Sequence, residues 1–222
     1  MTDVTLLTCQ AYFKPDNITP YIQNILFEEQ LLKSALENQG LTVDITYWNN
    51  PSYDWSKTRS LVFRTIWDYF ERFDEFLLWL EEVRHQTQLI NSYDLVKWNI
   101  DKHYLKELSE KGIKIVPTYF AKKNSQRNLA EIIESQQWKD VVIKPAISAS
   151  AYKTFKILEE TVNSNEKLFK DLLNQRDMLV QPFINTIEKF GEASLMVIDG
   201  KFTHAILKKA KPGDFRVQDD FG

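Results

Sequence analysis

The chain has little of several residue types that mark special classes of protein. Its 222 residues include one cysteine, three histidines, six glycines and seven prolines. The single cysteine, Cys9, excludes an internal disulfide, and within the apolar run VTLLTC it is typical of a small buried side chain rather than a nucleophile. Three scattered histidines make no metal site. No apolar run is long enough to span a membrane, and the N-terminus lacks the basic stretch of a secretory signal.

Neither sign of charge dominates the sequence. There are 28 Lys and Arg against 31 Asp and Glu, a net charge of -3, which argues against a general nucleic-acid binder or an anionic-membrane binder. The composition, 43% hydrophobic and 27% charged, is that of an ordinary globular protein long enough for one or two cores. We therefore expect a soluble, cytoplasmic protein, either alone or as a homo-oligomer.

The first part of the chain predicts a small open α/β domain over residues 1–92. Residues 4–9 and 41–48 have strand patterns, and between them Thr19 and Pro20 are typical of the start of a helix that ends at Gly40. A third short strand over residues 61–63 leads into the segment RTIWDY and then a helical stripe from Phe73 to Val83. Strands that alternate with helices indicate an open sheet.

The second part, residues 93–222, mixes short strands with helices. Strands are expected at residues 113–116, 119–121, 141–143, 155–158 and 178–183, with Pro182 implying an edge strand or an exit from the sheet. Helices are expected after a cap at Asn99 or Asp101, at residues 128–137 and at 166–174. Asp199-Gly200 between two strand patterns predicts a hairpin with a type I′ turn.

The segment DVVIKPAISASAYK, residues 140–153, carries the first sign of chemistry. Lys144 directly follows a short apolar strand, and Ser148 to Ala151 are four small residues that allow backbone N–H groups to approach an anion closely. A lysine held beside such a loop is a candidate phosphate site. Taken alone, however, the segment fits better a strand that ends in a solvated lysine and a turn.

Five segments taken together favour the phosphate site over the solvated lysine and turn. They are WNIDKHYL (98–105), VVIKPAISASA (141–151), LVQPFI (179–184), GEASLMVIDGKFTHAILKK (191–209) and PGDFRVQDDFG (212–222). In this order they resemble the ATP-grasp superfamily, specifically its glutathione synthetase-like and cycloserine-forming cyclo-ligase-like branch. The resemblance runs from about Ser60 to the last residue. It implies an α/β fold in which a pre-ATP-grasp domain precedes an ATP-grasp module.

The resemblance also implies a nucleotide site. Lys102 and Lys144 would contact phosphates, which suits a mobile ammonium group. The lid loop of the family is usually rich in glycine, whereas the matching residues here contain none. Backbone groups of the QPFI segment would meet the adenine edge, and Glu188 and Glu192 would lie near the nucleotide, although both also fit surface carboxylates. The residues expected to bind ATP are Lys102, Lys144, Ser148, Ala149, Ser150, Gln181, Pro182, Phe183, Ile184, Glu188 and Glu192.

Catalytic and substrate residues follow from the same resemblance. Arg216 matches the arginine of the FR motif, which binds phosphate or an acyl phosphate, and a planar guanidinium suits such contacts. Strand alternation places Lys208 and Lys209 on opposite faces, so one of them can enter a cleft, and we assign Lys208. Arg64 and Asp68 fit either substrate contacts or a structural ion pair.

The implied function is ATP-dependent carboxylate–amine ligation through an acyl phosphate, with Mg²⁺ offsetting phosphate charge. Family members hold magnesium with an acidic residue and a later Glu-x-Asn, and the chain ends at Gly222 before either. Asp219 and Asp220 do not match those positions, so we expect an incomplete module that does not catalyse ligation alone. The alternative is a non-catalytic nucleotide-binding or interaction module that retains the fold.

Overall fold

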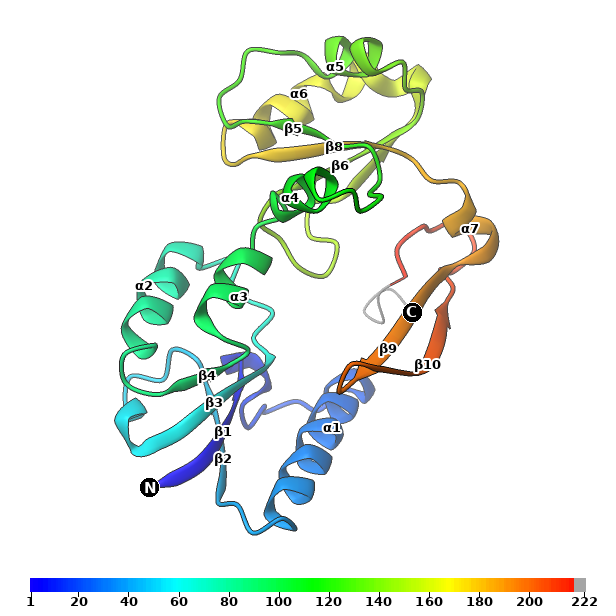
Figure 1. The fold of residues 1–222 in the computed structure, drawn as a ribbon. Helices are drawn as coiled ribbons and strands as arrows, with labels where there is room; N and C mark the ends of the chain where they lie inside the picture. The colour runs from blue at the N-terminus through cyan, green and yellow to red at the C-terminus, as the bar shows by residue number, and fades with distance from the viewer. Residues whose placement is uncertain (218–222) are drawn as a thin grey trace. The chain divides into compact units, whose positions relative to one another are not determined.

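A computed structural model describes residues 1–217 of the chain (Figure 1). It contains two compact units, of which the first is Met1–Ile100 and the second begins at Asp101. The predicted boundary after residue 92 falls at the cap of helix α3 (Tyr93–Asn99). Val96 of that helix and Ile100 pack on the core of the first unit, which is why this unit reaches Ile100.

The first unit is a four-stranded parallel sheet with helices between its strands. The strand order is β2-β1-β3-β4, and every neighbouring pair is parallel. Its elements are β1 (Thr2–Thr8), α1 (Pro20–Glu37), β2 (Val43–Tyr47), β3 (Thr58–Thr65), α2 (Phe73–Val83), β4 (Gln88–Ile90) and α3, with 3₁₀ turns at Gln10–Tyr12 and Trp55–Lys57. The open α/β expectation is confirmed; β4 and α3 were not predicted.

Local sequence explains how these elements begin and pack. The Thr19 hydroxyl accepts a hydrogen bond from the Ile22 N–H at 3.2 Å, and Pro20 occupies the first turn, as predicted for α1. The apolar face of α2 packs Phe76 and Leu80 against the sheet, next to the fully buried Trp48. Burying a large aromatic side chain of this kind contributes about 1.5–3 kcal/mol.

Polar side chains are also buried in the first unit, and they satisfy one another. The Thr65 hydroxyl donates to the carboxylate of Glu29 at 2.6 Å, and the Thr8 and Thr65 hydroxyl oxygens lie 2.6 Å apart. All three residues are buried. We call this set the hydroxyl–carboxylate cluster. It ties α1 to the ends of β1 and β3.

The second unit contains a four-stranded sheet in the order β5-β8-β6-β7, in which every neighbouring pair is antiparallel. Helices α5 and α6 cover one face of it (Figure 1), where Ile143, Met178 and Phe169 share one core. Its elements are α4 (Tyr104–Glu110), β5 (Tyr119–Ala121), α5 (Leu129–Gln136), β6 (Val141–Pro145), β7 (Phe155–Ile157), α6 (Val162–Leu173), β8 (Met178–Pro182), α7 (Thr186–Phe190), β9 (Glu192–Ile198) and β10 (Lys201–Lys208), with a 3₁₀ turn at Glu159–Thr161.

Two expectations for the second unit need correction, and one open alternative is decided. Residues 113–116 form no strand, because the alternating segment finds no partner strand among the described residues and Ile113 stays exposed. Of the two alternatives for Pro182, the structure has the exit from the sheet: β8 lies inside the sheet, its ladder to β5 ends at Val180, and Pro182 is the last residue of the strand. The cap of α4 is His103, whose N–H donates to the Asp101 carboxylate at 3.0 Å.

Strands β9 and β10 form the predicted hairpin. Asp199 and Gly200 both have positive φ, 51° and 70°, as a type I′ turn requires. This two-stranded ribbon carries exposed apolar side chains, including Leu195 and Phe202 at 66% and 63% exposure.

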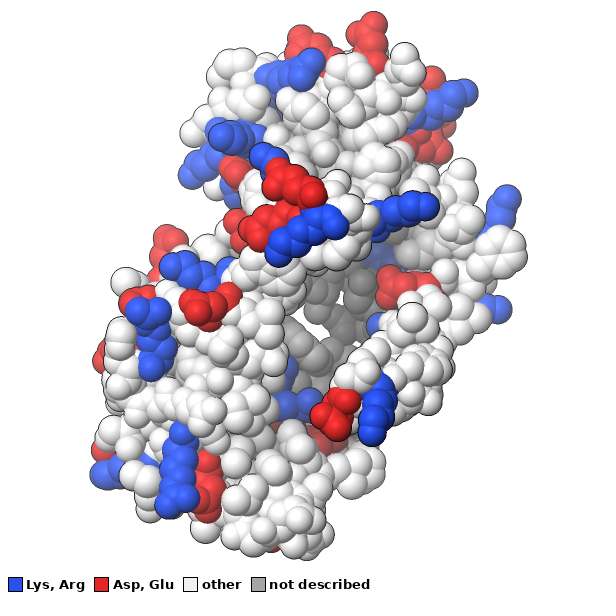
Figure 2. Space-filling view, viewed as in Figure 1, with Lys and Arg blue, Asp and Glu red and all other residues white. Residues whose placement is uncertain are grey.

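Surface charge is mixed. On the face seen in Figure 2, basic and acidic side chains alternate and lie between large uncharged areas. Within residues 1–217, no helix combines the length and the hydropathy that crossing a bilayer requires.

Candidate functional site

A cavity of about 350 Å³ lies in the second unit and gathers most of the predicted site residues. Segments far apart in the sequence meet there: the start of the unit, β6 and its following loop, the end of β8, the start of β9 and the tail after β10. The predicted residues that line it are Lys102, Lys144, Ser148, Ala149, Ser150, Gln181, Pro182, Phe183, Ile184, Glu192 and Arg216. Their contact with a nucleotide stays a prediction.

The alternation of β6 directs Lys144 into this cavity. Val141 and Ile143 point into the core beneath α5 and α6, whereas Val142 and Lys144 lie on the opposite face and line the cavity. Gln181 stands opposite Val142 on β8, and its side-chain amide donates to the Thr118 hydroxyl at 2.8 Å. One face of the sheet is thus core and the other is the wall of the site.

The ammonium group of Lys144 is half-buried and has no hydrogen bond or ion pair with any described residue. Burial lowers the pKa of Lys144 below its ordinary value, because removing water destabilises the charged form. A buried cation without a partner is costly in a structural role. It therefore favours a site for an anion.

Lys102 reaches the same cavity from the segment before α4. Its ammonium donates to the Ser148 carbonyl at 2.7 Å and to the Ser148 hydroxyl at 2.9 Å, and lies 3.4 Å from the Ala146 carbonyl. Burial lowers the pKa of Lys102 to about 8; the charge of Lys144 adds to this effect and Asp101 opposes it. Two ammonium groups in one cavity repel each other, and a bound anion would relieve that repulsion.

The loop after β6 holds an unusual backbone. Ser150 and Ala151 have φ values of 45° and 52°, in the left-handed region that costs a non-glycine residue roughly 1–2 kcal/mol. Ser148 is buried, and its hydroxyl also lies 3.3 Å from the Pro145 carbonyl. The contact between Lys102 and Ser148 therefore helps to hold a loop that lacks glycine.

Arg216 lines the cavity but is already paired. Its guanidinium donates to both carboxylate oxygens of Asp214, the shortest contact being 2.7 Å from Nη2 to Oδ2. Hydrogen bonds from Arg216 hold the pKa of Asp214 far below its ordinary value. Glu192, at the start of β9, lies 3.8 Å from the Lys208 ammonium across the hairpin.

Two predicted residues of the second unit, Lys208 and Glu188, are not among those that line the cavity. Lys208 faces Glu192, and Glu188 forms an ion pair with Lys156 at 2.7 Å. The Lys156 ammonium also lies 3.7 Å from the centre of the ring of Phe183, which lines the cavity, so Glu188 is linked to the cavity wall through Lys156.

Some backbone groups of the QPFI segment already make hydrogen bonds within the chain. The Phe183 N–H donates to the Asp140 carbonyl at 2.8 Å, and the Ile184 carbonyl accepts from the Ile187 N–H at 3.1 Å. A ligand that contacts this segment would meet other groups of its backbone, or one of these after rearrangement.

Arg64 and Asp68 lie in the first unit, and each has its own partner. Arg64 Nη2 lies 3.7 Å from Glu28, and Asp68 accepts a hydrogen bond from the indole N–H of Trp48 at 2.9 Å. A cavity of about 380 Å³ in this unit, next to the end of β3, is lined by Phe63, Ile66, Trp67, Tyr69, Phe76, Asn91, Leu95, Val96, Asn99 and Ile100. Neither Arg64 nor Asp68 lines it, and a substrate role for them stays a prediction.

The described residues do not by themselves make a magnesium site. Across residues 1–217, no three His, Cys, Asp or Glu side chains lie close enough together to hold a metal ion. Glu192 is the single carboxylate among the described residues that line the cavity, and it could contribute one ligand to a magnesium ion that is otherwise held by substrate phosphates. Asp219 and Asp220 lie outside the described residues.

Sequence reasoning missed several members of the site. Val142 was detectable, since it stands two residues before Lys144 on the same face of β6. Thr154 and Ile187 also line the cavity, and no sequence pattern marks them. Phe215 lines it too and could have been found as the first residue of the FR motif. Asp214, the partner of Arg216, is not among the site residues that the sequence predicts.

Comparison with known protein families assigns both parts of the chain. Residues 100–221 match the RimK-like ATP-grasp domain, and residues 4–91 match the N-terminal domain of the D-cycloserine synthetase DcsG. The first of these matches covers more than half of the chain.

Individual proteins agree with this assignment. The cycloserine biosynthesis protein DcsG of Streptomyces lavendulae is 30% identical over 185 residues, which cover 81% of this chain and 61% of that protein. The crystal structure of D-cycloserine synthetase DcsG superposes with a TM-score of 0.81 at 27% identity, covering 93% of this chain and 67% of the other. D-alanine–D-alanine ligase from Bacillus anthracis, complexed with ATP, shares the fold with a TM-score of 0.59 at 11% identity, over 94% and 67% of the two chains.

Proposed function

The chain belongs to the RimK-like ATP-grasp family, and from that premise we propose that the cavity of its second unit binds the phosphates of ATP. The observation that carries this proposal is the pair of half-buried ammonium groups, Lys102 and Lys144, in one cavity. Lys144 has no hydrogen-bond or ion-pair partner among the described residues, and a bound anion would offset the free-energy cost of burying its charge.

The reaction we propose for the whole protein is ATP-dependent ligation of a small-molecule carboxylate to an amine. The carboxylate oxygen attacks the γ-phosphorus of ATP and ADP leaves, which forms an acyl phosphate. The amine nitrogen then attacks the acyl carbon, and the carbon–oxygen bond to phosphate breaks. Lys102 and Lys144 would bind and orient the phosphates; when bound, magnesium would neutralise part of their charge.

Arg216 can contact a transferred phosphoryl group only if it leaves its partner Asp214. Its guanidinium suits a transferred phosphoryl group, but in the ligand-free chain it is neutralised by Asp214. We propose that anion binding competes with Asp214 for this guanidinium.

A second candidate is a nucleotide-binding module that does not catalyse ligation. The observation that favours it is that no three-ligand cluster lies within residues 1–217 and that a single described carboxylate, Glu192, lines the cavity. The chain spans 61% of the length of its cycloserine-forming relative, so the activity of a whole protein remains a proposal.

Thermal unfolding with added ATP tests the binding proposal. A ligand that binds only the folded state stabilises it by RT ln(1 + [L]/Kd), about 2.7 kcal/mol at a hundredfold excess over Kd. We expect this gain in the wild type and in the control Lys139→Met, whose parent side chain is 82% exposed. Lys144→Met should lose most of it. Equal stabilisation of Lys144→Met and wild type would contradict the proposal.

Phosphate release separates the two candidate functions. ATP and a panel of amino acids, as carboxylate and amine donors, are incubated with the chain. Amino-acid-dependent turnover near one per second, an ordinary enzyme rate, would favour the ligase. ATP binding without turnover would favour the binding module for this chain.

A further inference from the structure

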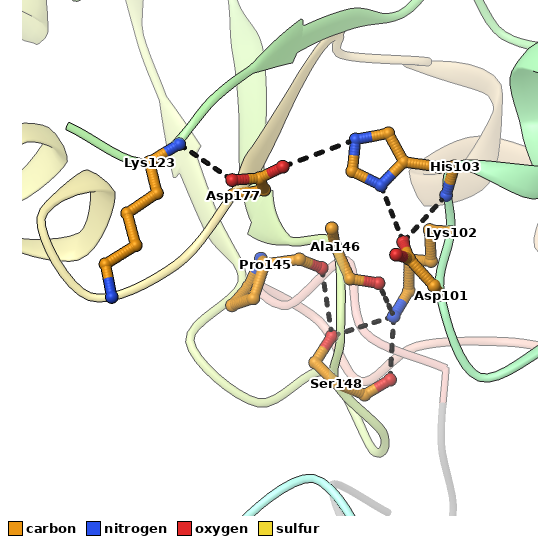
Figure 3. Close-up of polar contacts among 8 residues, drawn as sticks. All are labelled: Asp101, Lys102, His103, Lys123, Pro145, Ala146, Ser148 and Asp177. Atoms are coloured by element: carbon orange, nitrogen blue, oxygen red, sulfur yellow. Dashed lines mark hydrogen bonds and ion pairs between the residues drawn. The ribbon is translucent and has the colours of Figure 1, made fainter. Parts of the chain in front are cut away.

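A network of polar contacts around His103 lies next to Lys102 (Figure 3). Neither the sequence motifs nor the comparisons assign this network a role. The His103 ring Nδ1 lies 2.7 Å from the Asp101 carboxylate, and Nε2 lies 3.6 Å from the carboxylate of Asp177. The ring also stacks on Phe120 of β5, with centroids 5.1 Å apart. His103 is thus held on three sides, immediately after Lys102 in the chain.

Asp177, just before β8, connects this ring to the sheet. Its carboxylate accepts a hydrogen bond from the Lys123 N–H at 2.7 Å, and its carbonyl accepts from the Ala146 N–H at 2.9 Å. Ala146 in turn accepts from the Lys102 N–H at 3.0 Å. The backbone of Lys102 is therefore held in two ways: its N–H donates to Ala146, and the next residue in the chain is His103. Both Ala146 and His103 contact Asp177.

The position of Lys102 needs such support, because Lys102 does not stand on a strand. It belongs to the turn before α4, and its ammonium must reach Ser148, which lies 46 residues further along the chain. A long side chain on a free turn would leave the ammonium in water, where its charge is better solvated. In Figure 3 the Lys102 side chain instead points at Ser148.

We propose that His103 and Asp177 are positioning residues, which hold the Lys102 ammonium in the cavity where it meets an anionic ligand. This inference rests on the proposed function only for the identity of that ligand. The placement of Lys102 is a property of the ligand-free chain and can be measured without any nucleotide.

The first measurement is an NMR titration of Lys102 in the ligand-free protein, with ¹³C-labelled lysine and the signal assigned by its loss in Lys102→Met. The charged groups that act on this ammonium are Lys144 and Asp101. We expect a pKa of about 8 in wild type. His103→Phe keeps a ring to stack on Phe120 but loses both ring nitrogens, and should move the pKa toward the ordinary value of about 10.4 as the ammonium enters water.

Two further variants sharpen this experiment. Asp177→Asn keeps an acceptor for the Lys123 N–H but removes the charge that faces His103, and should shift the pKa in the same direction by less. His204→Phe, on the exposed ribbon, is the matched control and should leave the titration unchanged. A wild-type pKa for Lys102 in His103→Phe would overturn the proposal, whatever the protein does with ATP.

The second measurement is a double-mutant cycle on ATP affinity. His103→Phe should weaken binding about tenfold in the wild-type background and have no further effect in the Lys102→Met background, because it acts through Lys102. An equal loss in both backgrounds would show that His103 acts independently of Lys102 and would contradict the proposal. If Lys102→Met itself leaves ATP affinity unchanged, the proposed phosphate role of Lys102 fails, and the titration still decides on the positioning.

Discussion

The two units of this protein bury polar groups in opposite ways. In the first, the polar side chains of the hydroxyl–carboxylate cluster bind one another: Thr65 lies 2.6 Å from both the Thr8 hydroxyl and the Glu29 carboxylate. In the second, Lys102 and Lys144 bring two positive charges to one cavity, and Lys144 has no partner among the described residues. Both arrangements are costly to bury, but only the first repays that cost within the fold.

This difference separates a structural polar group from a functional one. The hydroxyl–carboxylate cluster holds α1 to the sheet, and removing one member leaves the others buried without partners. Two cations without anionic partners behave in the opposite way. Removing one of them should stabilise the ligand-free protein and weaken the binding of an anionic ligand. The sign of a mutation's effect on stability therefore tests the comparison directly.

A large effect is expected from Thr65→Val, which keeps the shape of the side chain and removes its hydroxyl. The Glu29 carboxylate and the Thr8 hydroxyl would then lose this partner, and we expect the free energy of unfolding to fall by about 1–3 kcal/mol. Thr203→Val, on the exposed ribbon, is the control and should change stability by less than about 0.5 kcal/mol. Urea unfolding monitored by circular dichroism measures both.

Lys144→Met, which keeps the apolar stem of the side chain, should change the free energy of unfolding in the opposite direction. We expect the ligand-free variant to be at least as stable as wild type, because an unpaired half-buried charge has been removed. A loss of stability as large as that of Thr65→Val would show that Lys144 has a structural partner, and the comparison between the units would fail.

The next effect concerns the base of the ribbon, which places Glu192 at the cavity. Gly191 has φ of 90°, and a Cβ added there would overlap the carbonyl oxygen of Lys208. Gly191 also has ψ of −168°, a conformation that essentially only glycine adopts, so Gly191→Ala should cost about 1–3 kcal/mol for the backbone and more for the overlap. Gly112→Ala is the control for a lost glycine of positive φ without an overlap, since Gly112 has φ of 80° and nothing within 4 Å of an added Cβ. Equal losses in the two variants would show that the close approach at Gly191 has no energetic weight.

Local sequence predicted the parts of the fold that depend on neighbours in the chain. Thr19 and Pro20 begin α1, and Asp199 and Gly200 turn the hairpin. In each case the deciding interactions span only a few residues.

Long-range pairing set what the sequence could not predict. Residues 113–116 have the pattern of a strand but lack a partner, and nothing in the segment itself reveals this. Lys102 binds Ser148, and His103 faces Asp177, across dozens of residues. These contacts exist only once the chain has folded.

A smaller effect should appear in the dependence of stability on pH. The pKa of Lys102 is about 8 in the folded chain and about 10.4 when unfolded. Between these values the unfolded state binds more protons, so the free energy of unfolding rises with pH, by about 1 kcal/mol from pH 8 to 9. Burial raises the pKa of the Cys9 thiol to about 11, which acts in the opposite direction above pH 9.

The contribution of Lys102 is isolated by subtracting the profile of Lys102→Met from that of wild type. We expect a difference that grows between pH 8 and 9 in favour of wild type, and an ATP affinity of the wild type that falls over the same range as the ammonium loses its proton. Parallel stability profiles of the two proteins would show that Lys102 keeps its ordinary pKa, and that the cavity is wetter than the structure indicates.

The smallest expected effect is that of Glu188→Gln, and it tests where the site ends. Glu188 is 42% exposed and pairs with Lys156 at 2.7 Å, and exposed ion pairs contribute about 0.2–1 kcal/mol. We therefore expect a loss of stability within that range and an unchanged ATP affinity, since Glu188 is not among the residues that line the cavity. Isothermal titration of ATP measures the affinity, with Lys139→Met as the control for a lost surface charge. A tenfold weaker affinity of Glu188→Gln would show that this carboxylate reaches the nucleotide, as the family resemblance implies, and that the ion pair with Lys156 opens when the ligand binds.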